Sequence, residues 1–345
     1  MFLSLHTRST DAWDAMFSSM VSAQKSIYIE MYTFSDDTKE THDFVSLLSK
    51  KAREGVHVAM ILDSLGSLYL SRTVITALRS AGVEVFFYGH WLYRTHRKFV
   101  IVDEARAFVG GVNIVQYSFA WRDLQIELSG YIVQRLTAVF AKNYKELGGK
   151  KVVHTLSQKK RERQQVRAWL LDHTPFVGRK RLRKYYEDKI QSARRSIVFI
   201  TPYFIPSAWL FDVLRRAIVV RKLRVTILLP QHTDPLFVDH ANRYYALQMT
   251  HLGASVYLVP GMNHGKAVLI DASECLIGSA NVDPISFERN NELGVFFTDT
   301  AAVRALTTIS AEWQEEGTLF TASAYHLTWY EWIFTYCVRF MHPFL

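Results

Sequence analysis

The sequence contains only two cysteines, Cys275 and Cys337, in 345 residues. Two distant cysteines cannot form the disulfide framework of a small secreted protein, and no cluster of cysteine and histidine has the spacing of a zinc site. We therefore expect two free thiols, buried or partly buried, in a reducing compartment.

Long apolar segments are also missing. The N-terminus, Met1 to Trp13, is polar from Ser4 onward and lacks the apolar core of an export signal. No uncharged apolar run reaches the roughly 18 residues that a membrane-spanning helix needs. The sequence therefore predicts neither an export signal nor a spanning helix.

Acidic residues are in the minority, since 41 lysines and arginines face 32 aspartates and glutamates, for a net charge of +9. A basic protein attracts anionic partners such as nucleic acid, phospholipid headgroups or acidic metabolites, and charge alone does not distinguish them. Hydrophobic residues make up 49% of the chain, which excludes a disordered protein. The length fits two fused domains.

An internal repeat organises the chain. The segment Ser22–Ile27 returns as Ser192–Ile197, and His96-Arg97-Lys98 returns as His264-Gly265-Lys266 at nearly the same offset. A nearly constant offset indicates that whole halves are duplicated. We place an N-terminal half at 1–150, a C-terminal half at 151–320 that begins with a basic linker and first strand (151–184), and a tail at 321–345.

Within each half, apolar runs typical of strands alternate with helical segments that end at glycine. This order predicts an α/β fold in which each half is a mixed sheet flanked by helices. The expected strands are Ile27–Phe34, Val56–Leu62, Val83–Tyr88, Val166–Leu171, Ile197–Phe204, Val225–Leu229 and Ala254–Val259. The expected helices are His42–Glu54, Ser71–Ala81, Ala208–Val219 and Asn242–Leu252.

Each half also carries one polar motif, in which Lys follows His at the second position, Asp at the seventh, the first Gly at the fourteenth and Asn at the seventeenth. Residues i and i+2 of a strand face the same side, so His and Lys point together. The aspartate lies where the following strand turns, which favours a structural role for it. The two copies are His96, Lys98, Asp103, Gly110 and Asn113, and His264, Lys266, Asp271, Gly278 and Asn281.

These motifs resemble the His-x-Lys-x4-Asp signature of the phospholipase D superfamily. The chain is most similar to bacterial cardiolipin synthases of the short type without N-terminal spanning helices, from about Asp11 to Trp313. The narrower likeness depends on Phe108–Asn113, Trp121-Arg122-Asp123, Thr201–Pro206, Ile277–Pro284, Ser286, Asn290 and Glu292.

The resemblance implies two halves related by pseudo-twofold symmetry, with both motifs at one cleft and no metal or cofactor. One histidine attacks phosphorus to form a covalent phosphohistidine, and the other exchanges protons with the alcohols. By resemblance His96 is the nucleophile and His264 the acid/base, which requires different pKa values for them. The groups expected around the phosphate oxygens are Lys98, Lys266, Asn113, Asn281, Ser279 and the backbone of Gly111.

Each histidine also needs an orienting carboxylate. Glu292 lies downstream of His264 at the family position. Asp123 lies downstream of His96 at a spacing that is one residue shorter, and it is the nearest counterpart. Asp123 is also a candidate to contact substrate.

Cardiolipin synthases of this type join two phosphatidylglycerols and release glycerol. A lipid hydrolase releasing phosphatidic acid, a nuclease and a non-enzymatic binding protein remain alternatives. The aromatic tail Tyr325–Leu345 is typical of an interfacial helix, although a helix packed on the core would look similar. We therefore expect anionic phospholipid and a membrane surface as partners, a peripheral location on the cytoplasmic side, no nucleic acid, and no need for an oligomer to build the site.

Overall fold

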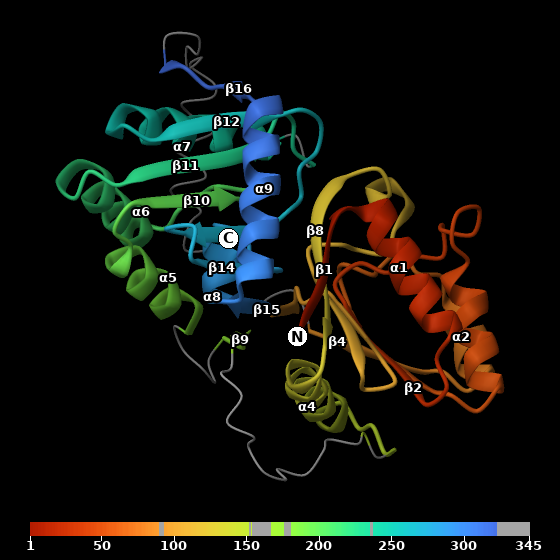
Figure 1. Ribbon diagram of the computed structural model, residues 1–345. Coiled ribbons are helices and arrows are strands. Elements are labelled where there is room, and N and C mark those ends of the chain that lie inside the picture. Colours follow the sequence, from red (N-terminus) through yellow and green to blue (C-terminus); the bar gives the residue numbers. More distant parts are fainter. Residues whose placement is uncertain (90–92, 152, 154–166, 176–180, 235–236, 323–345) are drawn as a thin grey trace.

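The computed structural model describes residues 1–89, 93–151, 153, 167–175, 181–234 and 237–322. These residues form two β-sheets with helices on both faces, one sheet for each half of the sequence (Figure 1). The predicted α/β fold is confirmed. The aromatic segment 323–345 and the basic run Lys159–Arg163 lie outside the described residues.

The first sheet has seven strands in the order β1-β8-β7-β6-β2-β3-β4. Helices α1 to α3 cover its outer face and α4 covers the inner one. The strands are β1 Phe2–Arg8, β2 Ser26–Met31, β3 His57–Asp63, β4 Glu84–Tyr88, β6 Phe99–Val102, β7 Arg106–Gly110 and β8 Arg122–Ser129. The helices are α1 Ser9–Val21, α2 Phe44–Arg53, α3 Arg72–Ser80 and α4 Tyr131–Glu146.

The second sheet has nine strands and follows the same plan, in the order β16-β12-β11-β10-β13-β14-β15-β5 with β9 beside β15. The strands are β5 Arg94–Thr95, β9 Ala168–His173, β10 Ser196–Ile200, β11 Arg224–Pro230, β12 Ser255–Val259, β13 Ala267–Ile270, β14 Glu274–Gly278, β15 Asn290–Phe297 and β16 Thr318–Leu319. The helices are α5 Arg181–Ser192, α6 Ala208–Arg215, which continues as a π-helical turn to Val220, α7 Phe237–Leu252, α8 Pro284–Glu288 and α9 Thr300–Glu316.

Most expected elements are found within a few residues of their predicted ends. The α2 helix begins after Asp43, whose carboxylate accepts a hydrogen bond from the Ser46 N–H at 2.9 Å. The α7 helix begins earlier than the predicted Asn242, because polar Asp239 and His240 in its first turn conceal the apolar period. Sequence patterns did not predict β1, β8 or β15.

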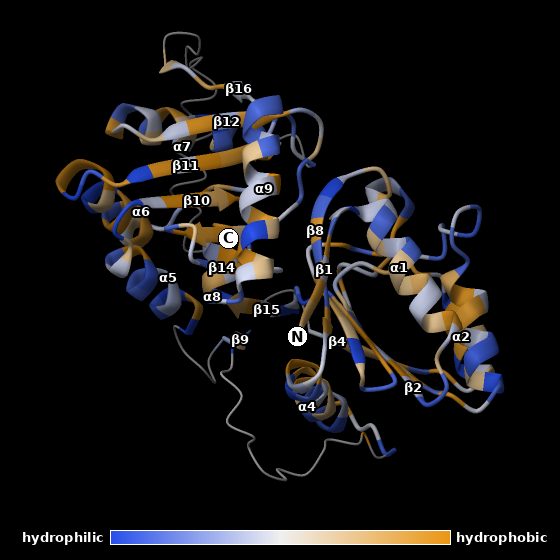
Figure 2. Ribbon diagram, viewed as in Figure 1, coloured by the Kyte–Doolittle hydropathy of each residue, from blue (hydrophilic) through white to orange (hydrophobic). Residues whose placement is uncertain are grey.

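Three buried clusters hold the layers together, and the apolar strands stand out in Figure 2. One joins the first sheet to α1–α3, and another joins the second sheet to α5–α7. The largest lies between the sheets and includes α4 and α9, so burial of apolar surface fixes the two halves against each other. No helix of the described part of the chain is long and apolar enough to cross a membrane.

The two halves also exchange backbone hydrogen bonds at their seam. The short strand β5 (Arg94–Thr95) leaves the first half and pairs in parallel with Asn290 and Asn291 of β15. Next to it, the His96 N–H donates to the Asn291 carbonyl at 2.9 Å. At the equivalent position of the second half, the His264 N–H donates to the Arg122 carbonyl of the first half at 2.7 Å.

Candidate active site

The two His-x-Lys segments meet where the halves join. His96 and Lys98 precede β6, and His264 and Lys266 precede β13, so each pair points off the end of a buried strand. All four side chains are almost fully buried. Each ammonium donates back to the carbonyl of its own histidine, Lys98 at 2.8 Å and Lys266 at 2.5 Å.

Each histidine is oriented by a carboxylate from the other half. His96 Nδ1 lies 3.0 Å from Glu292 Oε1, and His264 Nδ1 lies 2.7 Å from Asp123 Oδ2. The spacing along the chain pairs Glu292 with His264 and Asp123 with His96, each within one half, and so does not predict this crossing. The crossing follows from the seam, because the backbone bonds of His96 and His264 go to the residues that immediately precede Glu292 and Asp123.

The Glu292 carboxylate is held by Ser279, whose hydroxyl donates to Glu292 Oε2 and accepts from the Leu293 N–H. The hydroxyl is therefore engaged with the carboxylate, in place of the phosphate contact expected from the sequence. Ser279 thus contacts Glu292, which in turn contacts His96.

Gly111 also differs from expectation. Its N–H donates to the Leu124 carbonyl at 3.0 Å and is not free for a phosphate oxygen. A Cβ at this position would lie 2.2 Å from Asp123 Oδ1. Gly111 thus leaves room for the carboxylate that orients His264, and Asp123 itself contacts His264 and the Leu124 N–H.

Both imidazoles are neutral at neutral pH. Burial and then Lys98 lower the pKa of His96 to about 4, and burial and then Lys266 lower the pKa of His264 to about 4. Burial opposes ionisation of Glu292, but His96 holds its pKa down at about 2. Because a carboxylate only accepts hydrogen bonds, Nδ1 of His96 carries the proton and Nε2 keeps its lone pair.

The roles of nucleophile and acid/base that the sequence predicts require different pKa values for the two histidines. In the structure both pKa values are lowered to the same extent. The reason is that the halves repeat the same burial and the same neighbouring lysine. A difference between the rings therefore has to arise when substrate binds.

The two lysine ammonium groups lie close enough for the charge of Lys266 to act on Lys98, which makes this region a candidate anion site. Burial and then the charge of Lys266 lower the pKa of Lys98 well below its usual range, and burial lowers the pKa of Lys266 to about 8. An anion bound between them would relieve this repulsion. It would also raise both histidine pKa values, because the lysine charges help to depress them.

The two asparagines of the motifs are not equivalent. Asn113 Oδ1 accepts from the Thr33 N–H at 3.2 Å, which leaves its amide N–H groups for a ligand. Asn281 hydrogen-bonds the Asp283 side chain, and its buried Oδ1 has no hydrogen-bond partner among the described residues.

The motif aspartates bind backbone groups. Asp103 accepts from the N–H groups of Gln24, Lys25 and Ser26 at 2.7–3.1 Å. Asp271 accepts from the N–H groups of Arg194, Arg195 and Ser196 at 2.7–2.9 Å. Each carboxylate thus fixes the start of a neighbouring central strand, β2 or β10.

We expect Asp271→Ala to lower the free energy of unfolding by about 2 kcal/mol, because three backbone donors lose a charged acceptor. The folded variant should keep kcat within about threefold of the wild type. Urea denaturation and turnover measured on the same sample would test this. A much larger loss of kcat at unchanged stability would give Asp271 a direct part in catalysis.

The anion site predicts a pH dependence. Because Lys266 loses its proton near pH 8, kcat/KM should fall above that pH through weaker substrate binding. Lys266→Arg should move this alkaline limb upward by more than about one pH unit, since arginine stays charged. An alkaline limb unchanged in Lys266→Arg would mean that another group controls it. The measurement is kcat/KM against pH for both proteins.

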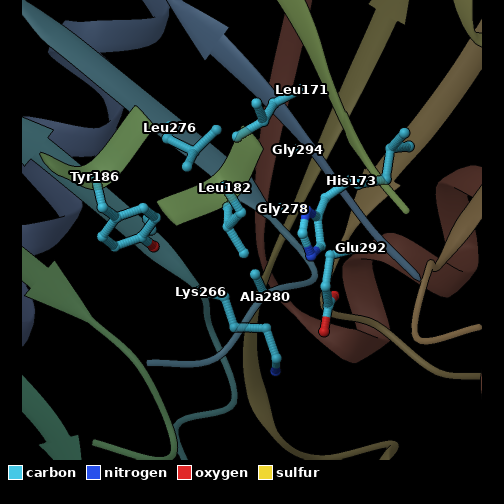
Figure 3. Close-up of a pocket in the computed structure, with 12 residues that line it drawn as sticks. Leu171, His173, Leu182, Tyr186, Lys266, Leu276, Gly278, Ala280, Glu292 and Gly294 are labelled. Carbon is cyan, nitrogen blue, oxygen red and sulfur yellow. The ribbon is translucent and has the colours of Figure 1, made fainter. Parts of the chain in front are cut away.

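A narrow, mostly apolar crevice extends behind Glu292 and Lys266 (Figure 3). His173 of β9 lies directly opposite Glu292 of β15, and its buried ring is close to the Glu292 carboxylate in Figure 3. Burial lowers the pKa of His173, and the nearby Glu292 carboxylate opposes this shift. Sequence reasoning missed His173 because it lies outside the two repeated motifs.

A family model described as "Cardiolipin synthase, PLD-like domain" matches residues 16–146 and 186–313, so it recognises both halves. The chain belongs to the cardiolipin synthase PLD-like family.

Curated members of this PLD-like family align with most of the chain. A "Probable cardiolipin synthase YwiE" of Bacillus subtilis is 30% identical and covers 87% of this chain and 63% of its own length. "Cardiolipin synthase 2" of Bacillus anthracis is 32% identical, with 87% and 62% coverage. "Major cardiolipin synthase ClsA" of Bacillus subtilis is 30% identical, with 89% and 67% coverage. The chain thus spans somewhat less than two thirds of the first of these relatives.

Solved structures agree on the PLD-like fold. Phosphatidylserine synthase of Haemophilus influenzae superposes with a TM-score of 0.78 over 99% of this chain and 93% of its own, at 13% identity. Polyphosphate kinase of Porphyromonas gingivalis gives a TM-score of 0.63 over 99% of this chain and 53% of its own, at 10% identity. At such low identity these similarities show the fold alone.

Proposed function

We propose that this protein is a phosphatidyltransferase of the cardiolipin synthase type, which joins two phosphatidylglycerols to cardiolipin and releases glycerol. One observation carries the proposal: two histidines, each oriented by a carboxylate of the other half, lie close enough to the same two buried lysines for both lysine charges to lower the pKa of each ring. The sequence relatives named cardiolipin synthase give the substrate class.

In the first step, Nε2 of His96 attacks the phosphorus of phosphatidylglycerol. The bond from phosphorus to the glycerol oxygen breaks, and His264 supplies the proton that the departing glycerol needs. Lys98, Lys266 and Asn113 stabilise the charge on the non-bridging oxygens. The bound phosphodiester anion raises the pKa of both histidines, which lets His264 carry the proton that an acid requires, while His96 is used as the nucleophile.

In the second step, a hydroxyl of another phosphatidylglycerol attacks the phosphatidyl-histidine. His264 takes the hydroxyl proton, the bond from phosphorus to His96 breaks, and cardiolipin leaves. Water in place of the lipid alcohol would give phosphatidic acid through the same intermediate, so hydrolysis is the second candidate. The sequence relatives favour transfer over hydrolysis.

We further propose that the protein works as a peripheral protein on the cytoplasmic face of the membrane. The net charge of +9 attracts anionic lipid. We also retain the division into halves at 1–150 and 151–320 with a tail at 321–345. The family match to 16–146 and 186–313 supports the two halves.

The test is product analysis with phosphatidylglycerol vesicles and a chelator, read by mass spectrometry. Cardiolipin with free glycerol is the expected result. Phosphatidic acid alone would make water the acceptor. Absence of lipid turnover would overturn the proposal and bring forward the nuclease alternative, to be tried with single-stranded DNA.

A further inference from the structure

Four aromatic side chains lie near the two histidines, and we call them the aromatic collar: Tyr32 and Trp121, which contact the histidine rings, Tyr117, which contacts Trp121, and Tyr203, which interacts electrostatically with Tyr32 and Tyr117. The Tyr32 ring meets the His96 ring at 4.8 Å between centroids and lies 5.0 Å from the Lys98 ammonium. The Trp121 ring lies 5.3 Å from the His264 ring and 5.3 Å from the Tyr117 ring. The collar thus reaches both imidazoles.

The collar is asymmetric although the catalytic residues are duplicated. Ser26 aligns with Ser196, so Tyr32 aligns with Pro202, and Tyr203 aligns with Thr33. One extra residue lies in the second half between its motif asparagine and its carboxylate. Depending on where this extra residue is placed in the alignment of the halves, Tyr117 aligns with Ile285 or Ser286. Trp121 aligns with Arg289 or Asn290. The residues present in both halves suit the two equivalent non-bridging oxygens of the phosphate. Aromatic residues that lack a counterpart in the other half suit a substituent that is present on only one side of the phosphorus.

The alcohol is such a group, and it lies on the side of His264. In the proposed mechanism His264 exchanges protons with both the leaving and the incoming alcohol. Trp121 and Tyr117 are the collar members next to His264, and Tyr117 is 57% exposed, so a ligand can reach it.

The hydrogen bonds of Tyr117 leave a donor available. Among the described residues no group accepts a hydrogen bond from the Tyr117 hydroxyl, so the phenol O–H can be given to a ligand. Tyr203 differs, because its hydroxyl already donates to the Asp234 carbonyl. Tyr117 is therefore the collar tyrosine on the His264 side with a donor to offer.

We propose that Tyr117 and Trp121 form the subsite for the acceptor alcohol, which is a vicinal diol such as a glycerol headgroup, and that they favour transfer over hydrolysis. This rests on the proposed function. One hydroxyl meets His264 and attacks phosphorus, while the neighbouring hydroxyl accepts a hydrogen bond from Tyr117. The face of Trp121 packs against the carbon chain and leaves less room for water. A site built to bond a hydroxyl discriminates against an acceptor that lacks it.

The experiment measures how the phosphatidyl group is divided among acceptors. Full-length protein is given phosphatidylcholine or phosphatidylglycerol vesicles with equal amounts of 1,2-propanediol and 1-propanol, and all products are quantified by mass spectrometry. We expect the wild type to prefer the diol, and Tyr117→Phe to lose about fivefold of that preference, as one hydrogen bond would give. Trp121→Ala should raise the share of phosphatidic acid by a similar factor. The control is Tyr131→Phe, a tyrosine of α4 that is 58% exposed and follows the end of β8 opposite to Asp123.

The outcomes separate the two proposals. A diol preference in Tyr117→Phe equal to that of the wild type would overturn the subsite while leaving the transferase intact. A wild type that turns over no lipid, or that forms phosphatidic acid alone, would overturn the proposed function and the subsite with it.

Discussion

Replacing His96 with asparagine should lower lipid turnover by about 10⁴-fold or more, because the covalent step loses its nucleophile. His264→Asn should cost at least about 10³-fold, since proton transfer to and from the alcohols is lost. Turnover is measured with phosphatidylglycerol vesicles, and the trapped intermediate is mapped by peptide mass spectrometry. We expect the modified residue to be His96.

The matched control is His232→Asn, which changes a histidine whose side chain is 63% exposed. It should keep wild-type activity. Near-normal turnover in either His96→Asn or His264→Asn, with a folded protein, would exclude the two-histidine mechanism. A modified His264 in the wild type would reverse the roles assigned here.

The crossed pairs predict the second large effect. Glu292→Gln should slow formation of the intermediate by about 10³-fold or more, because an amide no longer fixes the tautomer of His96 that can attack. Asp123→Asn should slow turnover by a similar factor at the steps that His264 serves. An aryl phosphodiester separates the two effects, since its phenolate leaves without an acid. The initial burst of phenolate should be lost in Glu292→Gln and kept in Asp123→Asn.

Glu288→Gln, at an exposed position of α8, is the control for Glu292→Gln. With His96 mapped as the modified residue, loss of the burst in Asp123→Asn instead of Glu292→Gln would mean that the pairs run within each half. Equal effects of both variants on the burst would mean that neither carboxylate is specific for one ring.

The sequence predicted the α/β halves and the motif residues because these depend on local patterns. A helical segment that ends at glycine predicts α3, and an apolar run predicts β4. The repeated spacing identifies His96 and His264. The crossing of Glu292 and Asp123 depends on how the two halves pack, which no spacing along the chain records.

Individual contacts were also beyond the sequence. Ser279 and Gly111 occupy matching motif positions, and both were expected at the phosphate. In the structure Ser279 binds the longer carboxylate, Glu292, and Gly111 makes space for the shorter one, Asp123. The two positions therefore adapt to the two different acids of the crossed pairs.

The crossing also has a consequence during synthesis of the protein. The ribosome completes the first half, with His96 and Lys98, long before Glu292 is added. At that stage His96 lacks the group that holds its tautomer, and Asp123 has no imidazole to orient. The nascent chain therefore carries one complete motif without its orienting carboxylate, and the proposed phosphodiester chemistry requires that the second half has folded against the first.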